Sequence, residues 1–252
     1  MEKDEQLLKK RLLELAELCF HRDIPLHTDF LNLNEQTIFH SLAGKLPPVS
    51  CVMTGGYHPA ERKIVCFLPS YMDKERFVPP LSCICLSPLN LRFAEDLTHR
   101  DYLGAVMNLG IERCKIGDII QNEKEALLFC MEDMSEYISG ELTRVRHTQV
   151  QAALCQPEDI SFTPRYEIAE GSIASVRLDN MLALVYRCSR NKAVAYIEGE
   201  RVFINGKLAL SNSAPLKEGD IISVRGLGRF QYDGVQSETK KGRLFVIAKK
   251  YC

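Results

Sequence analysis

Residues 172–207 constrain this chain most, because they predict two short helices followed by a tight hairpin. Apolar residues recur at helical spacing over residues 178–185, which indicates a first amphipathic helix. Ser189 is a suitable N-cap for a second helix, since its hydroxyl can accept an otherwise unpaired backbone N–H. Gly199 is a typical helix stop, and Asn205-Gly206 is the strongest two-residue hairpin signal. The stretch therefore predicts a small unit of two helices and a hairpin.

Basic side chains stand at the starts of both helices, Arg177 at the first and Arg190 and Lys192 at the second. A helix N-terminus presents unpaired N–H groups and a partial positive charge, so it suits a phosphate. Cations at this position disfavour the helix itself by ~0.3–1 kcal/mol each. Two cations at one helix start therefore indicate that an anion is expected there.

The charge of the chain is divided unevenly along its length. The whole chain of 252 residues has a net charge of −1, which by itself says nothing about nucleic acid. Residues 171–252, however, hold 14 Lys and Arg against 7 Asp and Glu, a net charge of +7, so the remainder has −8. Such a split is typical of a chain with an RNA-facing end and a solvated or protein-facing end.

The C-terminal stretch resembles the S4 RNA-binding domain from residue 172 to about residue 230. The resemblance implies an αα–β module that holds structured RNA with its two helices. It rests on Arg177-Leu-Asp179, Ser189-Arg190, Lys192-Ala193, Ile197, Gly199, Val202, Asn205-Gly206-Lys207 and Gly219-Asp220-Ile-Ile-Ser-Val224.

The residues before and after this module predict mixed secondary structure. Residues 3–22 predict an amphipathic helix, and residues 34–43 predict a second helix. Between residues 49 and 155, short apolar strands alternate with helices at 98–109 and 132–139, which indicates an α+β layer with one sheet. After the module we expect strands at 221–224, 228–231 and 243–248, with an exposed loop over 232–242.

A middle segment is similar to the bacterial YlmH-type S4 proteins. The family implies an α+β chain with a small N-terminal helical unit, an RRM-like α/β sandwich domain and a C-terminal S4 domain. We place these over residues 1–46, 47–155 and 172–252, with a linker over 156–171. The resemblance rests on Leu97-Thr-His-Arg-Asp-Tyr-Leu-Gly-Ala105, Asn108-Leu-Gly-Ile111, Arg113, Lys115-Ile-Gly-Asp-Ile119 and Gly226-Leu-Gly-Arg-Phe230.

The family further implies a role that spacing and periodicity do not show. It implies binding to rRNA and tRNA on the large ribosomal subunit carrying peptidyl-tRNA, in quality control of stalled ribosomes. The basic and polar residues of the S4-like stretch are the expected RNA contacts, with Arg190, Lys192, Arg201 and Lys207 clustered around one helix start and one turn. The full set is Arg177, Arg190, Lys192, Arg201, Asn205, Lys207, Arg225 and Arg229.

The sequence offers little support for catalysis. His99-Arg100-Asp101-Tyr102 is the best candidate run, but adjacent helical residues point in different directions. We therefore expect it to cap the helix, with Arg100 in contact with phosphate or with a neighbouring subunit. We find no phosphate-binding loop and no nucleophile elbow. We therefore expect no enzyme activity, no cofactor and no small-molecule substrate. An RNA-modifying enzyme resembling pseudouridine synthases and a protein adaptor with an S4 domain for RNA targeting remain the alternatives.

The cysteines and the hydropathy indicate the compartment. Ten cysteines occur without a C-x-x-C pair or a His/Cys cluster at metal-ligand spacing, so we expect reduced thiols and no metal. No apolar run reaches the ~18 residues that a membrane-spanning helix needs. We therefore expect a cytoplasmic protein that does not bind membranes.

Overall fold

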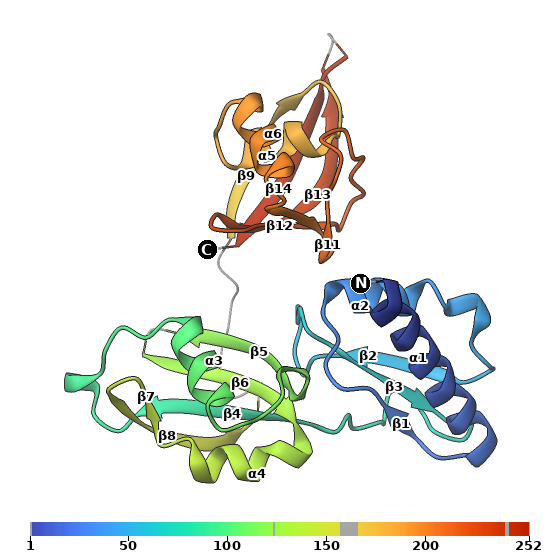
Figure 1. Cartoon of the computed structure of the whole chain (residues 1–252), viewed down its shortest axis with the longest axis vertical. Coiled ribbons are helices and arrows are strands. Elements are labelled where there is room, and N and C mark those ends of the chain that lie inside the picture. Colours follow the sequence, from blue (N-terminus) through green and yellow to red (C-terminus); the bar gives the residue numbers. More distant parts are fainter. Residues whose placement is uncertain (1, 123, 157–165, 240–241, 252) are drawn as a thin grey trace. The chain divides into compact units, whose positions relative to one another are not determined.

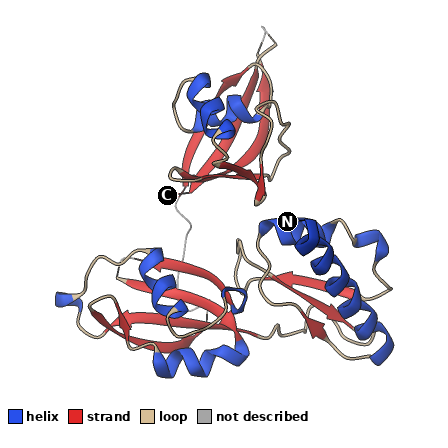
Figure 2. Ribbon diagram, viewed as in Figure 1, coloured by secondary structure: helices blue, strands red, loops and turns tan. Residues whose placement is uncertain are grey.

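The computed structural model describes residues 2–122, 124–156, 166–239 and 242–251 (Figure 1). Two units, residues 1–162 and 163–252, have separate hydrophobic cores. In each unit helices cover a face of a sheet, as Figure 2 shows. This mixed α+β architecture confirms the predicted fold class.

The first unit begins with a three-stranded sheet of order β1-β3-β2. Helix α1 packs its leucine stripe, including the buried Leu12 and Leu15, against this sheet, as the periodicity predicts. A capping box between Asn32 and Glu35 starts helix α2. The elements of this part are α1 (Glu2–Arg22), β1 (Leu26–His27), α2 (Leu33–His40), the 3-10 turn η1 (Ala43–Lys45), β2 (Ser50–Thr54) and β3 (Ile64–Leu68).

A five-stranded sheet of order β5-β6-β4-β8-β7 follows, with α3 and α4 packed on one face. Its β-α-β-β-α-β order, with the first and third strands adjacent at the centre, is the ferredoxin-like topology that RRM domains share. The predicted RRM-like fold is therefore confirmed. The elements are β4 (Leu81–Pro88), η2 (Leu91–Phe93), α3 (His99–Met107), η3 (Arg113–Lys115), β5 (Ile116–Asn122), β6 (Glu125–Met131), α4 (Glu132–Glu141), β7 (Arg144–Val145) and β8 (Thr148–Cys155).

Strand β3 joins the two sheets of the first unit, because every one of its residues is buried. Val65 and Phe67 pack towards α1 and α2. The alternate residues Ile64 and Leu68 pack against Phe129 and its neighbours on the five-stranded sheet. One hydrophobic cluster therefore runs across residues 46 and 47, where the sequence suggested a boundary. The domain boundaries that we placed there stay a prediction.

The second unit is a six-stranded sheet of order β11-β10-β12-β13-β14-β9, with α5 and α6 on one face. The Asn205-Gly206 turn joins Ile204 to its antiparallel partner Lys207, and both turn residues have positive φ, which confirms the predicted hairpin. The elements are β9 (Tyr166–Ile173), α5 (Leu178–Val185), α6 (Arg190–Glu198), β10 (Val202–Ile204), β11 (Lys207–Leu208), β12 (Ile221–Val224), β13 (Gly228–Glu238) and β14 (Leu244–Tyr251).

Two predictions of local structure in this unit are wrong. Residues 166–171, expected to belong to the linker, form part of β9, which pairs with β14 along its whole length. Residues 232–238, expected to be a loop, continue β13, because bulges near Gly234 let the strand keep its pairing with β14. The rest of the expected linker, residues 157–165, lies outside the described residues. Among the described helices none is long and apolar enough to cross a membrane.

Candidate nucleic-acid interface

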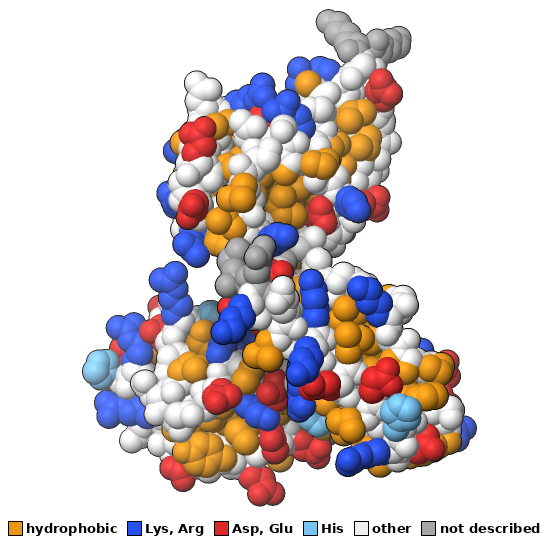
Figure 3. Space-filling model, turned by 45° about the vertical axis from the view of Figure 1, so that its right-hand side comes forward, with side chains coloured by type: hydrophobic (Ala, Val, Ile, Leu, Met, Phe, Trp, Pro, Cys, Tyr) orange, Lys and Arg blue, Asp and Glu red, His pale blue; other side chains and the backbone are white. Residues whose placement is uncertain are grey.

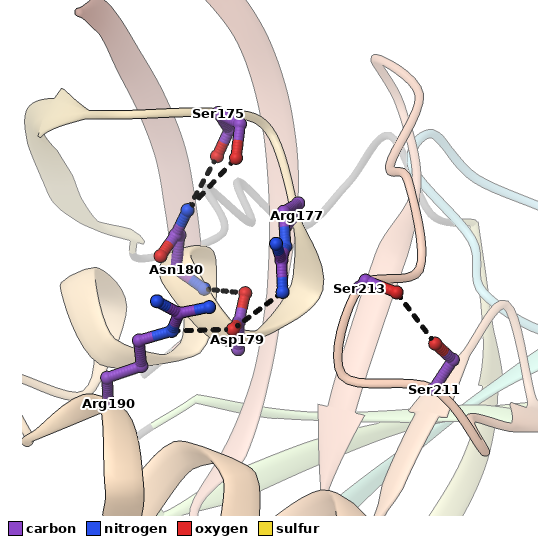
Figure 4. Close-up of polar contacts among 7 residues, drawn as sticks. All are labelled: Ser175, Arg177, Asp179, Asn180, Arg190, Ser211 and Ser213. Atoms are coloured by element: carbon purple, nitrogen blue, oxygen red, sulfur yellow. Dashed lines mark hydrogen bonds and ion pairs between the residues drawn. The ribbon is translucent and has the colours of Figure 1, made fainter.

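A buried carboxylate organises the start of helix α5. Asp179 is 0% exposed and accepts hydrogen bonds from the Nε of Arg190 at 2.8 Å and from a terminal nitrogen of Arg177 at 3.3 Å. Its other oxygen accepts the backbone N–H of Asn180 at 2.9 Å. Figure 4 shows Asp179 between the two arginines, one from the start of each helix. A single carboxylate thus brings two of the predicted site residues together.

The two arginines remain accessible although they are paired. The side chain of Arg177 is 35% exposed and that of Arg190 is 58% exposed. A buried carboxylate is stable only when it is paired, and here two cations face one anion, which leaves a net charge of +1. Arg190 donates to Asp179 through Nε, and a guanidinium has four further N–H groups that can fork onto phosphate oxygens.

The backbone N–H groups at the start of α5 are already used. Leu178 donates its N–H to the carbonyl of Ala214 at 3.0 Å, and Asp179 donates to Asn212 at 3.1 Å. Asn180 holds the preceding turn by donating its side-chain amide to the carbonyl of Ser175 at 3.0 Å. Segment 211–215 therefore caps α5 from outside the helix, and a phosphate at this helix would be bound by side chains.

The predicted contacts on α6 and in the hairpin lie on the helix-covered side of the sheet. Lys192 is exposed in the first turn of α6, where Ser189 accepts its backbone N–H at 3.3 Å. Lys207 is exposed and pairs with Ile204, whose side chain packs on the core beneath the helices. Residues paired across an antiparallel ladder share a face. Asn205 has a structural role, because its amide joins Asp220 and the N–H of Ile221.

Arg225 and Arg229 stack on aromatic rings of the opposite sheet face. The guanidinium carbon of Arg225 lies 4.8 Å from the ring centroid of Phe203. That of Arg229 lies 4.6 Å from the ring of Tyr251, where burial raises the hydroxyl pKa and the guanidinium opposes the shift. Phe203 alternates with Val202 and Ile204, which face the helix-covered core, so these stacks lie on the open face.

The basic residues that we predicted as one cluster therefore lie on two different faces of the six-stranded sheet. Arg201 lies over the ring of Tyr196 at 5.1 Å and donates to the backbone carbonyl of Arg225 at 2.6 Å, so it sits at the edge between the two faces. The helix side keeps Arg177, Arg190, Lys192 and Lys207. In the view of Figure 3, Lys and Arg side chains gather on one end of the second unit beside a band of hydrophobic side chains.

Comparison with known proteins covers nearly the whole chain. A curated relative, the "Ribosome-associated protein quality control protein P2" of Bacillus subtilis (strain 168), is 30% identical over 252 residues, which cover 98% of this chain and 96% of the relative. Three family models match along the chain: "YlmH, N-terminal" at residues 4–72, "Putative RNA-binding domain in YlmH" at 89–159 and "S4 domain" at 176–222. The chain belongs to the YlmH family.

A solved structure shares the fold over part of this chain. "Cell division protein ylmH from Streptococcus pneumoniae" is 22% identical, with a TM-score of 0.50, and the match covers 62% of this chain and 93% of the solved chain. The S4 match includes Arg177, Asp179 and Arg190 but ends before Arg225 and Arg229. The helix-side residues thus lie within the matched S4 domain, and the open-face stacks lie beyond it.

The pairing of Asp179 with both arginines could not be predicted from the sequence beyond the closeness of Arg177 and Asp179. The burial of its carboxylate depends on segment 211–215, which follows it by more than 30 residues and carries no recognisable signal. The spacing of Arg177 and Asp179 across the first turn was the only local hint.

Proposed function

We propose that this chain is a non-enzymatic RNA-binding factor that binds structured RNA on the ribosome. The observation that carries the proposal is the Asp179 cluster, which fixes Arg177 and Arg190 at the starts of two helices with one positive charge in excess. Phosphate neutralisation by such cations supplies affinity without sequence readout, and structured RNA is recognised mainly by shape and backbone. The S4 match and the name of the ribosome-associated relative support the same conclusion.

The finer proposal is that the RNA is rRNA and tRNA on the large subunit. There the chain would act in the rescue of stalled ribosomes that carry peptidyl-tRNA. The relative's name, which refers to ribosome-associated quality control, supports this proposal. The exposed Lys192 and Lys207 extend the cationic helix side beyond the arginine pair, as an extended RNA surface requires.

Co-sedimentation with separated ribosomal subunits tests this proposal. The variant Lys192→Glu/Lys207→Glu changes two exposed ammonium groups without touching Asp179. We expect the wild-type chain to pellet with large subunits at low salt and less at high salt, and the variant to lose most of this binding. The control Lys45→Glu/Lys74→Glu makes the same charge change on exposed residues of the first unit and should bind like the wild type.

The outcomes of this experiment separate the finer proposal from the coarser one. Equal binding by the variant and the control would contradict the proposal that the helix-covered side of the second unit binds RNA. Binding to small subunits alone would contradict the large-subunit assignment while leaving RNA binding intact.

The non-enzymatic part of the proposal has its own test. Nucleosides of rRNA and tRNA from a strain that lacks the gene should match those of the parent strain. A modified nucleoside missing from the deletion strain and restored by the wild-type gene would show an RNA-modifying enzyme instead.

A further inference from the structure

The sheet face that RRM-type domains usually offer to RNA is covered in this chain. In such domains, bases stack on aromatic side chains of the central strands. The aromatic residue on this face is Phe129 of β6, which is 1% exposed and stacked on Tyr57 with ring centroids 4.7 Å apart. Ile64 and Leu68 of β3 pack beside it. A base therefore cannot reach the ring while the two sheets of the first unit are packed together.

The accessible remainder of this face offers little for a base. Its exposed residues on β8 are Gln149, Gln151 and Ala153, none of which is aromatic or charged. If this domain contacts RNA, another surface must provide the contact.

The loop between β4 and α3 carries an apolar tip. Leu89 is 63%, Leu91 66% and Phe93 76% exposed, and the guanidinium of Arg92 lies over the Phe93 ring at 5.9 Å. In Figure 1 the loop projects away from the five-stranded sheet beside β7. An exposed aromatic ring with an arginine on its face is a suitable platform for a base.

A cationic groove lies between α3 and the segment around β7. It has a volume of about 500 Å³, and its lining includes Arg100 of α3 and Arg144 and Arg146 around β7. All three side chains belong to exposed residues. The groove also includes Asp101, which is held by Thr98 and lies 3.7 Å from Arg146, and the exposed Glu141. Three cations against two carboxylates leave the groove positively charged.

Hydrogen bonds tie the loop that carries the tip to the strands beside the groove. Leu89 donates its N–H to the carbonyl of Gln149 at 3.0 Å, and His147 donates its N–H to Glu95 at 3.0 Å. The first bond joins the β4–α3 loop to strand β8. The second joins the loop to the turn between β7 and β8, which also carries Arg146. The platform and the groove are thus held at the same end of the sheet.

We propose that this end of the five-stranded sheet is a second RNA site, which takes an unpaired nucleotide. The base stacks on Phe93, and the adjoining phosphates bind in the groove of Arg100, Arg144 and Arg146. Unpaired RNA fits better than an acidic protein, because the same end of the sheet carries cations and an exposed ring that every base can stack on. The proposal rests on the proposed function and extends it to a surface outside the S4 domain.

The absence of tryptophan from this chain gives a direct test. Phe93→Trp in the full-length protein introduces a single indole at the tip, and a stacked base should quench its fluorescence. A single-stranded oligouridylate of about 12 nucleotides, within the usual range of single-strand sites, is the probe. We expect saturable quenching by this probe and little quenching by a duplex of equal length. Phe20→Trp, at an exposed position of α1, is the matched control and should show none.

Neutralising the groove should weaken the same signal. Arg144→Gln/Arg146→Gln in the Phe93→Trp background should raise the probe concentration for half-quenching about tenfold, since two phosphate contacts are lost. Lys45→Gln/Lys74→Gln makes an equal charge change elsewhere and should leave it unchanged. Phe93→Ala should weaken probe binding by a similar factor, about tenfold, when measured by fluorescence anisotropy of a labelled probe.

The results distinguish this site from the S4 surface. Absence of quenching at position 93, with ribosome binding retained through Lys192 and Lys207, would overturn the second site and leave the proposed function standing. Equal quenching at positions 20 and 93 would also overturn the second site. So would a probe concentration for half-quenching that stays the same when Arg144 and Arg146 are replaced by Gln. Crosslinking of 4-thiouridine RNA to the tryptic peptide that contains Phe129 would show that the sheet face is used after all.

Discussion

Two carboxylates, Asp118 in the first unit and Asp179 in the second, each lie near two arginines, but the arginines serve different purposes. Asp118 accepts hydrogen bonds from the hydroxyl of Tyr57 at 2.8 Å and from the backbone N–H groups of residues 61 and 62 at 2.6 and 3.1 Å. The guanidinium of Arg62 donates to the backbone carbonyls of Phe30 and Ile116 at 2.9 and 3.0 Å. These bonds tie the three-stranded sheet to the five-stranded sheet.

At Asp179, by contrast, both guanidinium groups bond the carboxylate itself, and more than half of the Arg190 side chain is exposed. Near Asp118, burial lowers the pKa of Arg62 and lowers that of Arg113 to about 10. Arginines beside a carboxylate therefore do not by themselves predict a ligand site. What matters is whether their N–H groups are used within the fold or remain open to a ligand.

The largest difference should be in stability. Asp118→Ala removes the acceptor of three part-buried donors and the counter-charge of two part-buried arginines. It should lower the free energy of unfolding of the first unit by roughly 3–5 kcal/mol. Asp179→Ala should cost the second unit only about 1–3 kcal/mol, because its arginines can turn to water. Urea unfolding of the two full-length variants measures both values, and a larger loss for Asp179→Ala would contradict the comparison.

A smaller effect should appear in the pH dependence of the first unit. Burial raises the pKa of the Asp118 carboxyl above its ordinary value, and the Tyr57 bond opposes the shift only in part. Between the unfolded pKa of about 3.9 and the raised folded value, the folded chain binds more protons than the unfolded chain. The contribution of Asp118 to stability therefore falls as pH rises through that window.

Unfolding of the wild type and of Asp118→Asn at a series of pH values isolates this contribution. The free energy of unfolding of the wild type, minus that of the variant, should be greater at about pH 4 than at about pH 7. A difference that stays constant, or that grows with pH, would show that the carboxylate is not penalised by burial.

The smallest effect is expected at a surface pair of the second unit. Asp233 and Lys249 form an ion pair at 2.9 Å, with both side chains about one third exposed. Asp233→Asn should change the free energy of unfolding by less than about 0.5 kcal/mol, because exposed pairs contribute little. Thermal unfolding of this variant beside Asp179→Asn shows whether burial, rather than pairing alone, distinguishes Asp179.

Local signals explain what could be predicted from the sequence. The Asn205-Gly206 hairpin, the Ser189 cap of α6 and the leucine stripe of α1 each depend on a few adjacent residues, and the structure confirms them. Strand β9 was missed because its partner β14 lies more than 70 residues later. Strand β13 was cut short because residues 232–242 form a polar stretch, whereas residues up to 238 continue the strand through bulges.

For the candidate site, as for the fold, the sequence predicted the local features and missed those that depend on distant residues. The helix starts that carry Arg177, Arg190 and Lys192 follow from the periodicity and from the resemblance to S4 domains. The division of the basic residues between two faces did not follow, because it depends on the register of β10, β12 and β13. The roles of Asp118 and Asp179 depend on partners far away in the sequence, so no local pattern could separate them.

Binding to large-subunit rRNA over a salt series, for Asp179→Asn beside Asp118→Asn, tests the central claim most directly. The account predicts that Asp179→Asn weakens binding and makes the slope of log affinity against log salt shallower by about one to two, because Arg177 and Arg190 lose their positions. Asp118→Asn, if still folded by circular dichroism, should bind like the wild type. Unchanged binding by Asp179→Asn, or an equal loss in both variants, would contradict the account.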